Sequence, residues 1–256
     1  MRRRGLLATL ASAAVGAVVL PTAAHAQAPA TVGAPDTAAV ELRPLRPGVW
    51  LHTTYYRYPD GTRVPSNGLV VRDGDGLLLV DTAWGEQLTA ALLARIDREI
   101  GLTIRRAVVT HAHGDRLAGA DVLRGRGIPV WSLPATQRLA LASGMPVPGD
   151  TLGGLAAPGS ARAWGTVELF YPGPGHAPDN LMVWLPTARV LFGGCAVRGA
   201  TTTTLGNVAH ADLTSWPVAL RRAADRYPSA DIVVPGHAAP GGRELLAHSI
   251  ALLEHR

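Results

Sequence analysis

The sequence predicts an α/β protein whose two similar halves form one domain, a four-layer αββα sandwich with the helices outside. From Val49 onward, short β-branched runs alternate with amphipathic helical patterns, as expected for buried strands that helices cover. This pattern of strands and helices occurs twice along the chain. Of the 256 residues, 47% are apolar, so the chain can bury the large core that such a domain needs.

In the first half, strands are expected at residues 66–71 and 77–80. Between them lies Asp73-Gly74-Asp75-Gly76, a turn sequence that predicts a hairpin. A helix is expected at residues 85–100, because apolar side chains recur there at helical spacing: Leu88, Leu92, Leu93, Ile96 and Ile100. A further strand is expected at residues 104–109.

The second half should contain four strands, at residues 167–171, 181–185, 190–192 and 232–234. One helix is predicted by the apolar face of Trp216, Leu220, Ala223 and Tyr227. We expect Ser215 to cap this helix and Pro217 to lie in its first turn, where proline is tolerated. A last helix is expected at residues 243–254, and the Gly- and Pro-rich residues 144–160 should connect the halves.

The N-terminus has the features of a secretory signal peptide over residues 1–26. Arg2, Arg3 and Arg4 precede an apolar stretch, and Ala24-His25-Ala26 supplies small residues where a signal peptidase cleaves. The stretch is shorter than the roughly 20 apolar residues of a membrane helix, so no stable membrane anchor is expected. Both the general secretory route and the twin-arginine route remain open. These features predict a periplasmic protein with a mobile mature N-terminus at residues 27–45 and a single domain at residues 46–256.

The formal net charge of +5 does not predict a nucleic-acid partner. All 24 basic residues are arginine, and no basic run with interleaved aromatic residues occurs in the body of the chain. Loss of the three N-terminal arginines with the signal peptide, which contains no acid, would lower the charge from +5 to +2. We expect a monomer that acts on a small molecule.

Four apolar runs each end close to side chains that bind metals. Because ligand sites in such sheets form where strands end and loops begin, these side chains should meet at one edge. His111 and His113 are two residues apart, so an extended chain points both to the same side, and Asp115 continues the alternation. The full set of candidate ligands is His111, His113, Asp115, His176, Cys195 and His237.

Cys195 is the only cysteine, which is unusual for an exported protein. It could be a small buried apolar residue or a metal ligand. The flanking Gly193-Gly194 and the three other ligand-bearing strand ends favour ligation.

The chain resembles the class B, subclass 1 zinc β-lactamases from about residue 48 to residue 254. The resemblance rests on the His-Ala-His-Gly-Asp run, the later ligands, and shorter motifs: Ser66-Asn67-Gly68, Val80-Asp81-Thr82, Gly206-Asn207 and Pro235-Gly236-His237. It implies the metallo-β-lactamase fold and hydrolysis of the amide bond of penicillins, cephalosporins and carbapenems, which confers antibiotic resistance. It also implies two zinc ions per chain, one on His111, His113 and His176 and one on Asp115, Cys195 and His237.

These residue types suit that chemistry. Three neutral imidazoles leave a fourth tetrahedral position for a water whose pKa falls to about 7 on zinc, which provides a hydroxide nucleophile. A thiolate is a soft ligand that suits zinc. We expect Asp115 and Asn207 to be catalytic residues. The side chain of Asn207 could donate to the lactam carbonyl oxygen as that oxygen becomes charged. Asp81 could instead orient a ligand histidine or cap a turn at its strand end.

The resemblance assigns roles to residues around the ligands. Arg198 stands where the family usually has a lysine that binds the substrate carboxylate, and Asn207 should also contact substrate. Residues 56–64 resemble the flexible hairpin that folds over substrate. Arg116 replaces the commoner serine and is expected to lie against Cys195. We interpret His210 as a residue at the pocket rim.

Two other functions compete with lactam hydrolysis. Thioester and lactone hydrolases and nucleases of the wider fold family carry His-x-His-x-Asp-His and a bridging aspartate. Here Arg116 and Cys195 occupy those two positions, which favours lactam hydrolysis. A zinc-trafficking protein would need a closed site, whereas the ligand sets here leave an open coordination position.

Overall fold

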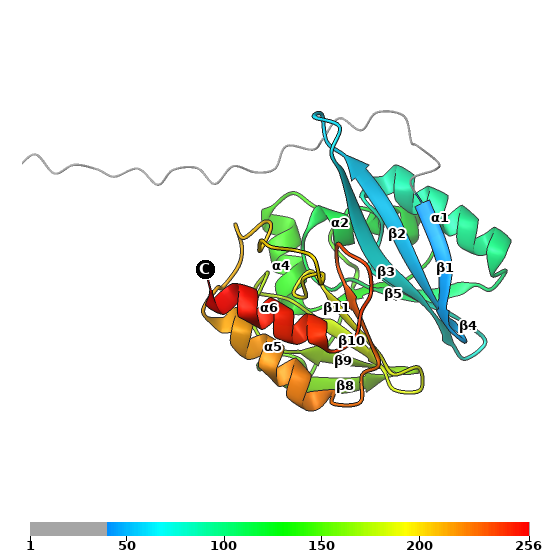
Figure 1. Cartoon of the computed structure of the whole chain (residues 1–256). Helices are drawn as coiled ribbons and strands as arrows, with labels where there is room; N and C mark the ends of the chain where they lie inside the picture. The colour runs from blue at the N-terminus through cyan, green and yellow to red at the C-terminus, as the bar shows by residue number, and fades with distance from the viewer. Residues whose placement is uncertain (1–39, 256) are drawn as a thin grey trace, which may run out of the picture. The chain divides into compact units, whose positions relative to one another are not determined.

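The computed structural model describes residues 40–255, and the predicted signal peptide lies outside them (Figure 1). The described chain forms two β-sheets that pack face to face, with helices on both outer faces. The predicted αββα sandwich is therefore confirmed.

The first sheet has seven strands in the order of the chain. Strands β1 to β4 pair antiparallel, whereas β4 to β7 pair parallel. The strands are β1 Val40–Arg46, β2 Val49–Arg57, β3 Arg63–Asp73, β4 Gly76–Val80, β5 Ile104–Val108, β6 Val130–Ser132 and β7 Asp150–Thr151. Most of the predicted mobile N-terminus lies outside the described residues, but its end was wrong: residues 40–45 pair with β2, and Val40 and Leu42 are buried.

The second sheet has five strands in the order β12-β11-β10-β9-β8. Its strands are β8 Ser160–Trp164, β9 Val167–Tyr171, β10 Met182–Leu185, β11 Val190–Gly194 and β12 Ile232–Pro235. Only β11 and β12 run parallel, so their carboxyl ends lie together at one edge. The chain passes from the first sheet to the second between β7 and β8. This passage lies within residues 144–160, where the connection was predicted.

Helices cover the outer faces (Figure 1). Helix α1 packs on the first sheet, and α5 and α6 lie side by side on the second. Their bounds are α1 Gly85–Glu99, α2 Gly114–Leu117, α3 Ala120–Gly125, α4 Pro134–Ala142, α5 Ser215–Arg226 and α6 Glu244–Glu254. Ser215 is not the cap of α5: the carboxylate of Asp212 instead accepts the backbone N–H groups of Thr214 and Ser215.

Three apolar clusters hold the four layers together. Alternation along the strands divides the side chains between them, because successive side chains point to opposite faces. In β4, Leu78 and Val80 face the second sheet, whereas Leu77 and Leu79 face α1. In β10, Val183 faces the first sheet and Met182 and Trp184 face α5 and α6. Each central strand is thus buried on both faces, which explains its continuous apolar run.

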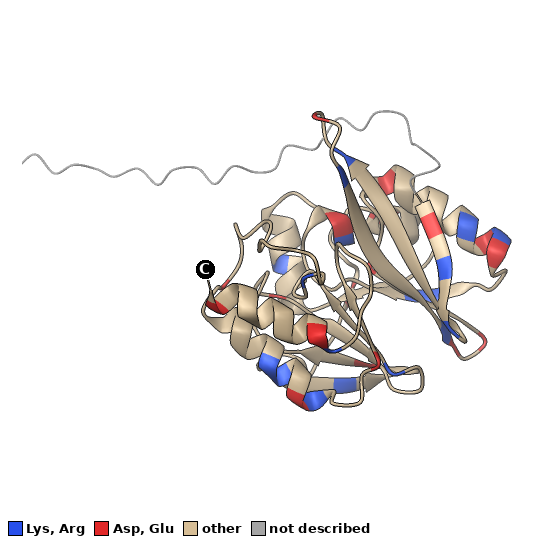
Figure 2. Cartoon of the chain, viewed as in Figure 1, with Lys and Arg blue, Asp and Glu red and all other residues tan. Residues whose placement is uncertain are grey.

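Charged residues of both signs are interspersed along the outer helices α1 and α5 (Figure 2). Exposed ion pairs include Arg95 with Glu99 on α1 and Arg105 with Asp75. Within residues 40–255, no helix is long and apolar enough to cross a membrane.

His52 on β2 is fully buried. Its ring lies against Gly68, where an added Cβ would come within 2.1 Å of Nε2, so only glycine fits there. Nε2 contacts the Val80 carbonyl at 3.2 Å. Burial lowers the pKa of His52 from 6.5 to about 4, because a charged imidazole would lose its hydration.

This buried imidazole should make stability depend on pH. Since the folded-state pKa lies below the unfolded value of 6.5, the unfolded chain binds the proton first as the pH falls. We expect His52 to lower the free energy of unfolding by about 3 kcal/mol between pH 6.5 and pH 4. Urea unfolding of metal-free wild type and His52→Gln across this range measures the difference. His255→Gln, at an exposed position, is the control, and an equal pH dependence in all three proteins would contradict the prediction.

Candidate metal centre

The first half supplies His111 and His113 from the segment that joins β5 to α2, and Asp115 from the first turn of α2. Asp81, at the end of neighbouring β4, holds this segment in place. Its carboxylate accepts the backbone N–H of Thr110 at 2.7 Å and the Thr110 hydroxyl at 2.9 Å. Thr110 Oγ1 lies 3.2 Å from Nδ1 of His111. Asp81 adopts a left-handed backbone conformation, with φ at 62°, which aspartate tolerates better than most residues.

The second half supplies His176, Cys195 and His237 from three loops. His176 lies between β9 and β10, Cys195 follows β11 directly, and His237 follows β12. All six predicted ligands therefore come together where the edges of the two sheets meet, and neither half contains a complete set.

The three histidines His111, His113 and His176 form one cluster. Each offers a ring nitrogen within 4.8 Å of the others, and Nδ1 of His113 lies 3.1 Å from Nε2 of His176. Nε2 of His111 is buried and has no hydrogen-bond partner among the described residues. A buried nitrogen without a partner is costly unless it binds something, so its lone pair is suited to a metal ion.

Asp115, Cys195 and His237 form a second cluster beside the first. Cys195 Sγ lies 3.1 Å from Nε2 of His237 and 3.6 Å from Oδ2 of Asp115. Nε2 of His237 lies 3.3 Å from the same carboxylate oxygen. His111 also comes within 4.8 Å of Asp115 and Cys195, so the two clusters adjoin.

Burial keeps the histidines neutral at neutral pH. It lowers the pKa of His113 to about 4 and that of His176 to about 3, and it holds those of His111 and His237 below the usual range. Neutral imidazoles present the lone pairs that metals require. Together with one carboxylate and one sulfur, this donor set fits zinc, which accepts nitrogen, sulfur and oxygen ligands.

Arg116 is fully buried directly behind the second cluster. Nη2 donates to Cys195 Sγ at 3.0 Å, and Nε lies 2.9 Å from Oδ2 of Asp115. Nη1 reaches Oδ2 of Asp81 at 3.4 Å.

Arg116 shifts the pKa values of its neighbours. Burial alone would raise the pKa of Asp115, but Arg116 and the surrounding imidazoles outweigh burial and lower this pKa to about 2. Burial raises the pKa of the Cys195 thiol, and Arg116 only partly offsets this. The predicted contact between Arg116 and Cys195 is present.

The structure places the remaining predicted residues around this centre. Arg198 is partly buried on the loop after Cys195, and its Nε donates to the Thr204 carbonyl at 3.2 Å. Asn207 lies on the exposed part of the same loop, where its Oδ1 accepts the backbone N–H of Ala209. His210 places Nδ1 at 2.9 Å from Nε2 of His113, so it contacts a candidate ligand directly.

Asp179 was missed by the sequence analysis. This buried residue follows His176 by three positions, and its Oδ2 accepts the backbone N–H of Ala112 at 2.9 Å. It thereby ties the loop of His176 to the segment that carries His111 and His113. No periodicity marks such a residue, although a lone acid close to a candidate ligand was a usable signal.

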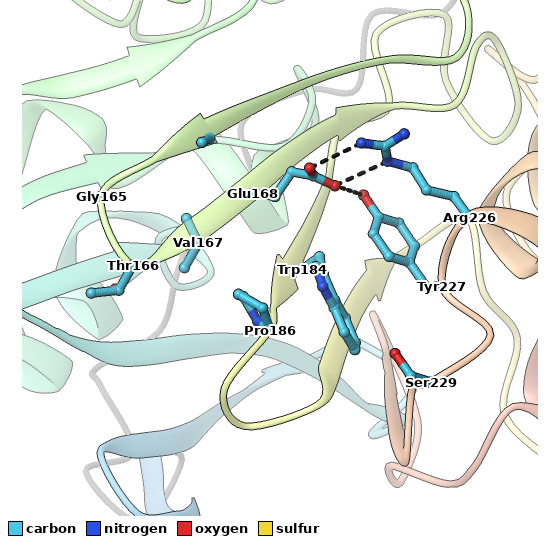
Figure 3. A pocket seen from close by; sticks show the side chains of 10 residues that line it. Gly165, Thr166, Val167, Glu168, Trp184, Pro186, Arg226, Tyr227 and Ser229 are labelled. Atoms are coloured by element: carbon cyan, nitrogen blue, oxygen red, sulfur yellow. Dashed lines mark hydrogen bonds and ion pairs between the residues drawn. The ribbon is translucent and has the colours of Figure 1, made fainter.

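A separate pocket of about 490 Å³ lies on the second sheet and is lined by residues of β9, β10 and α5 (Figure 3). Its charged groups are paired with one another: Glu168 accepts two hydrogen bonds from Arg226 and one from the Tyr227 hydroxyl. It contains none of the candidate ligands. The cluster of six candidate metal ligands is therefore the better candidate for the functional site.

The fold and this donor cluster define a class of protein, the αββα sandwiches with a metal centre at the sheet edges. The chain belongs to the metallo-beta-lactamase superfamily, whose family model matches residues 61–237.

Comparisons with individual proteins agree with this. The chain is 39% identical over 220 residues to a protein named metallo-beta-lactamase type 2 of Bacillus sp. (strain 170), covering 86% of this chain and 84% of that protein. A crystal structure of a metallo-beta-lactamase from Hirschia baltica has a TM-score of 0.81 at 37% identity, covering 84% of this chain and 97% of that one. A crystal structure of a metallo-beta-lactamase from Pseudomonas aeruginosa in its mono-zinc form has a TM-score of 0.81 at 36% identity, covering 84% of this chain and 95% of that one.

Removal of Arg116 should destabilise the metal-free protein strongly. Arg116→Ala would leave the buried carboxylates of Asp81 and Asp115 without their cation, so we expect the free energy of unfolding to fall by about 3–5 kcal/mol. Arg105→Ala, which breaks only the exposed pair with Asp75, should cost at most about 1 kcal/mol. Urea unfolding of both variants measures this. Similar small losses in the two would show that Arg116 does not hold the carboxylates.

Proposed function

We propose that this protein is a zinc-dependent β-lactamase that hydrolyses the amide bond of β-lactam antibiotics and so confers resistance. One observation carries the proposal: Asp115, Cys195 and His237 lie within 3.6 Å of one another, beside a cluster of three histidines. Membership of the superfamily and 39% identity to a protein named metallo-beta-lactamase type 2 support it. Carbapenems are included in the proposed substrates.

Two zinc ions per chain are proposed. His111, His113 and His176 would hold one, and Asp115, Cys195 and His237 the other. A zinc ion held by these three neutral imidazoles would supply Lewis-acid activation of the hydrolytic water at neutral pH. With its thiol ionised on metal binding, the second set would be more anionic than the first, which suits it to a second cation.

The protein's own residues bind and orient the substrate. Asp115, which belongs to the second cluster and adjoins His111 of the first, is proposed to take part in catalysis. Arg198 presents a guanidinium to the carboxylate of the antibiotic, since its charge persists and its donors form a fork. The side-chain amide of Asn207 donates to the lactam carbonyl oxygen as negative charge develops on it.

An aromatic surface borders the centre where the hairpin of β2 and β3 approaches it. The rings of Tyr56 and Trp84 lie 5.2 Å apart, and Trp84 lies 6.3 Å from the ring of His237. Tyr58, near the tip of the hairpin, is 40% exposed and packs edge-on against Tyr56. Such rings supply apolar area for an antibiotic side chain.

Residues 1–26 are proposed to be a cleavable signal peptide that directs export to the periplasm, where β-lactams act. The mature enzyme is proposed to be a monomer that needs no macromolecular partner for this reaction.

The direct test is hydrolysis of a carbapenem by purified protein, followed by ultraviolet absorbance. We expect turnover that a chelator abolishes and zinc restores, because all proposed catalysis depends on the metal centre. Inhibitors directed at serine enzymes should have no effect. Full activity after exhaustive metal removal would refute the proposed function.

Replacement of Arg198 should affect binding more than turnover. The guanidinium would contact the substrate carboxylate in ground and transition states alike. Arg198→Ala should therefore raise KM more than it lowers kcat, and the loss in kcat/KM should correspond to about 1.5–3 kcal/mol. Steady-state kinetics on a β-lactam and on its carboxylate ester measure this.

The ester is the control, since it lacks the group that Arg198 binds. It should be hydrolysed almost equally by wild type and Arg198→Ala. Equal losses on acid and ester would show that Arg198 supports the loop and does not recognise the carboxylate.

A further inference from the structure

The loop of His237, residues 235–238, is tied to one short segment of β3, residues 65–67, in the other half of the chain. Pro65 accepts a hydrogen bond from Nδ1 of His237 at 2.7 Å. The backbone N–H of Asn67 donates to the Gly236 carbonyl at 2.9 Å. About 170 residues of sequence separate these partners, yet they join the two sheets directly at the metal centre.

The side chain of Asn67 holds this loop on both sides of His237. Its Nδ2 donates to the Pro235 carbonyl at 2.8 Å and to the Ala238 carbonyl at 2.7 Å. Its Oδ1 accepts the hydroxyl of Thr53 at 2.8 Å. Asn67 is buried, and both amide hydrogens and the amide oxygen are used. We call this arrangement of Thr53, Asn67 and residues 235–238 the Asn67 clamp.

The chemistry of the Asn67 clamp requires an amide. Two carbonyl oxygens face one end of the side chain, so that end must donate twice, whereas the other end must accept. Aspartate has nearly the same shape but cannot donate when ionised, and it would place its charge against two carbonyl dipoles. The hydroxyl of Thr53 donates to Oδ1 and so fixes which end of the amide faces the loop.

The clamp acts on the coordinating atom of His237. Because Nδ1 donates to Pro65, Nε2 carries the lone pair and points to Cys195 at 3.1 Å and to Asp115 at 3.3 Å. Little alternative space exists for the loop, since a Cβ on Gly236 would lie 2.6 Å from Nη2 of Arg116 and 2.7 Å from Sγ of Cys195. Displacement of the loop would therefore disturb the second cluster directly.

Other residues hold the three-histidine cluster. Asp81 and Thr110 position His111, and Asp179 ties Ala112 to the loop of His176. None of the side-chain hydrogen bonds of Asn67 reaches these segments. The contacts of Asn67 thus distinguish one metal cluster from the other.

We propose that Asn67 is a positioning residue for the second metal site, because its amide holds the carbonyls on both sides of His237 and keeps Nε2 facing Cys195 and Asp115. The inference rests on the proposed second zinc. It predicts that loss of the amide weakens the second zinc selectively and leaves the three-histidine site intact.

The test is zinc titration of metal-free full-length protein against a chromophoric chelator. In Asn67→Asp, we expect the affinity of the second site to fall about 10- to 100-fold, as is common for residues that orient metal ligands, with the first site changed less than about 3-fold. Thr53→Val should weaken the second site less, because the amide keeps its donors but loses its anchor. Thr53→Ser, which keeps the hydroxyl, is the matched control and should match wild type.

Cobalt(II) substitution gives a readout that folding alone would not change. When two cobalt ions are added per chain, the thiolate-to-cobalt absorption should be weaker in Asn67→Asp than in wild type. The absorption bands of cobalt at the three-histidine site should persist. Unchanged second-site affinity, or equal losses at both sites, would overturn the inference. If Asn67→Asp does not fold, Thr53→Val decides, and wild-type zinc binding in that variant would overturn it. If wild type binds only one zinc ion, and its cobalt-substituted form shows no thiolate-to-cobalt absorption, the proposed second site itself would be refuted.

Discussion

The ion pairs of Arg116 are the interaction on which the metal centre depends. A fully buried guanidinium contacts Asp115, Asp81 and Cys195, and it also donates to the backbone carbonyls of Asn67 and Gly236. Buried carboxylates without a counter-ion would take up protons or force the loops apart. Because Arg116 contacts segments from both halves, it sets their spacing before any metal is bound. The guanidinium also lies against the thiol that the proposed second zinc would use, so both cations would contact the same side chains.

The apolar layer between the sheets determines where these loops meet. Alternating side chains of β4, β10 and β11 fill this layer, so their strands end at fixed positions relative to one another. Each cluster of candidate ligands draws side chains from loops or helices that follow strands of both sheets. Local unfolding of either half would therefore release both metals, and metal binding should stabilise the packing of the two halves as a unit. Asn67 and Asp179 add hydrogen bonds across the same joint, one for each cluster.

Much of this arrangement was predictable from the sequence, because central strands are buried on both faces and their apolar runs end at metal-binding side chains. The runs before His111, His176, Cys195 and His237 predicted four strands, and the structure brings the candidate ligands after them together. The short strands β6 and β7 have too few residues for a periodic signal, and β1 lies in a segment whose composition suggested mobility. The roles of Asn67, Asp179 and His210 depend on partners far along the chain, which no local pattern reveals. Asp212 took the capping role expected of Ser215 because its carboxylate reaches two backbone N–H groups at once.

We propose that six side chains from the two halves form two adjoining metal sites. Crystals of the zinc-loaded protein, measured on both sides of the zinc absorption edge, would locate any bound zinc. We expect two anomalous-scattering peaks, one among His111, His113 and His176 and one among Asp115, Cys195 and His237. A second peak remote from Cys195, or a single peak at saturating zinc, would contradict it.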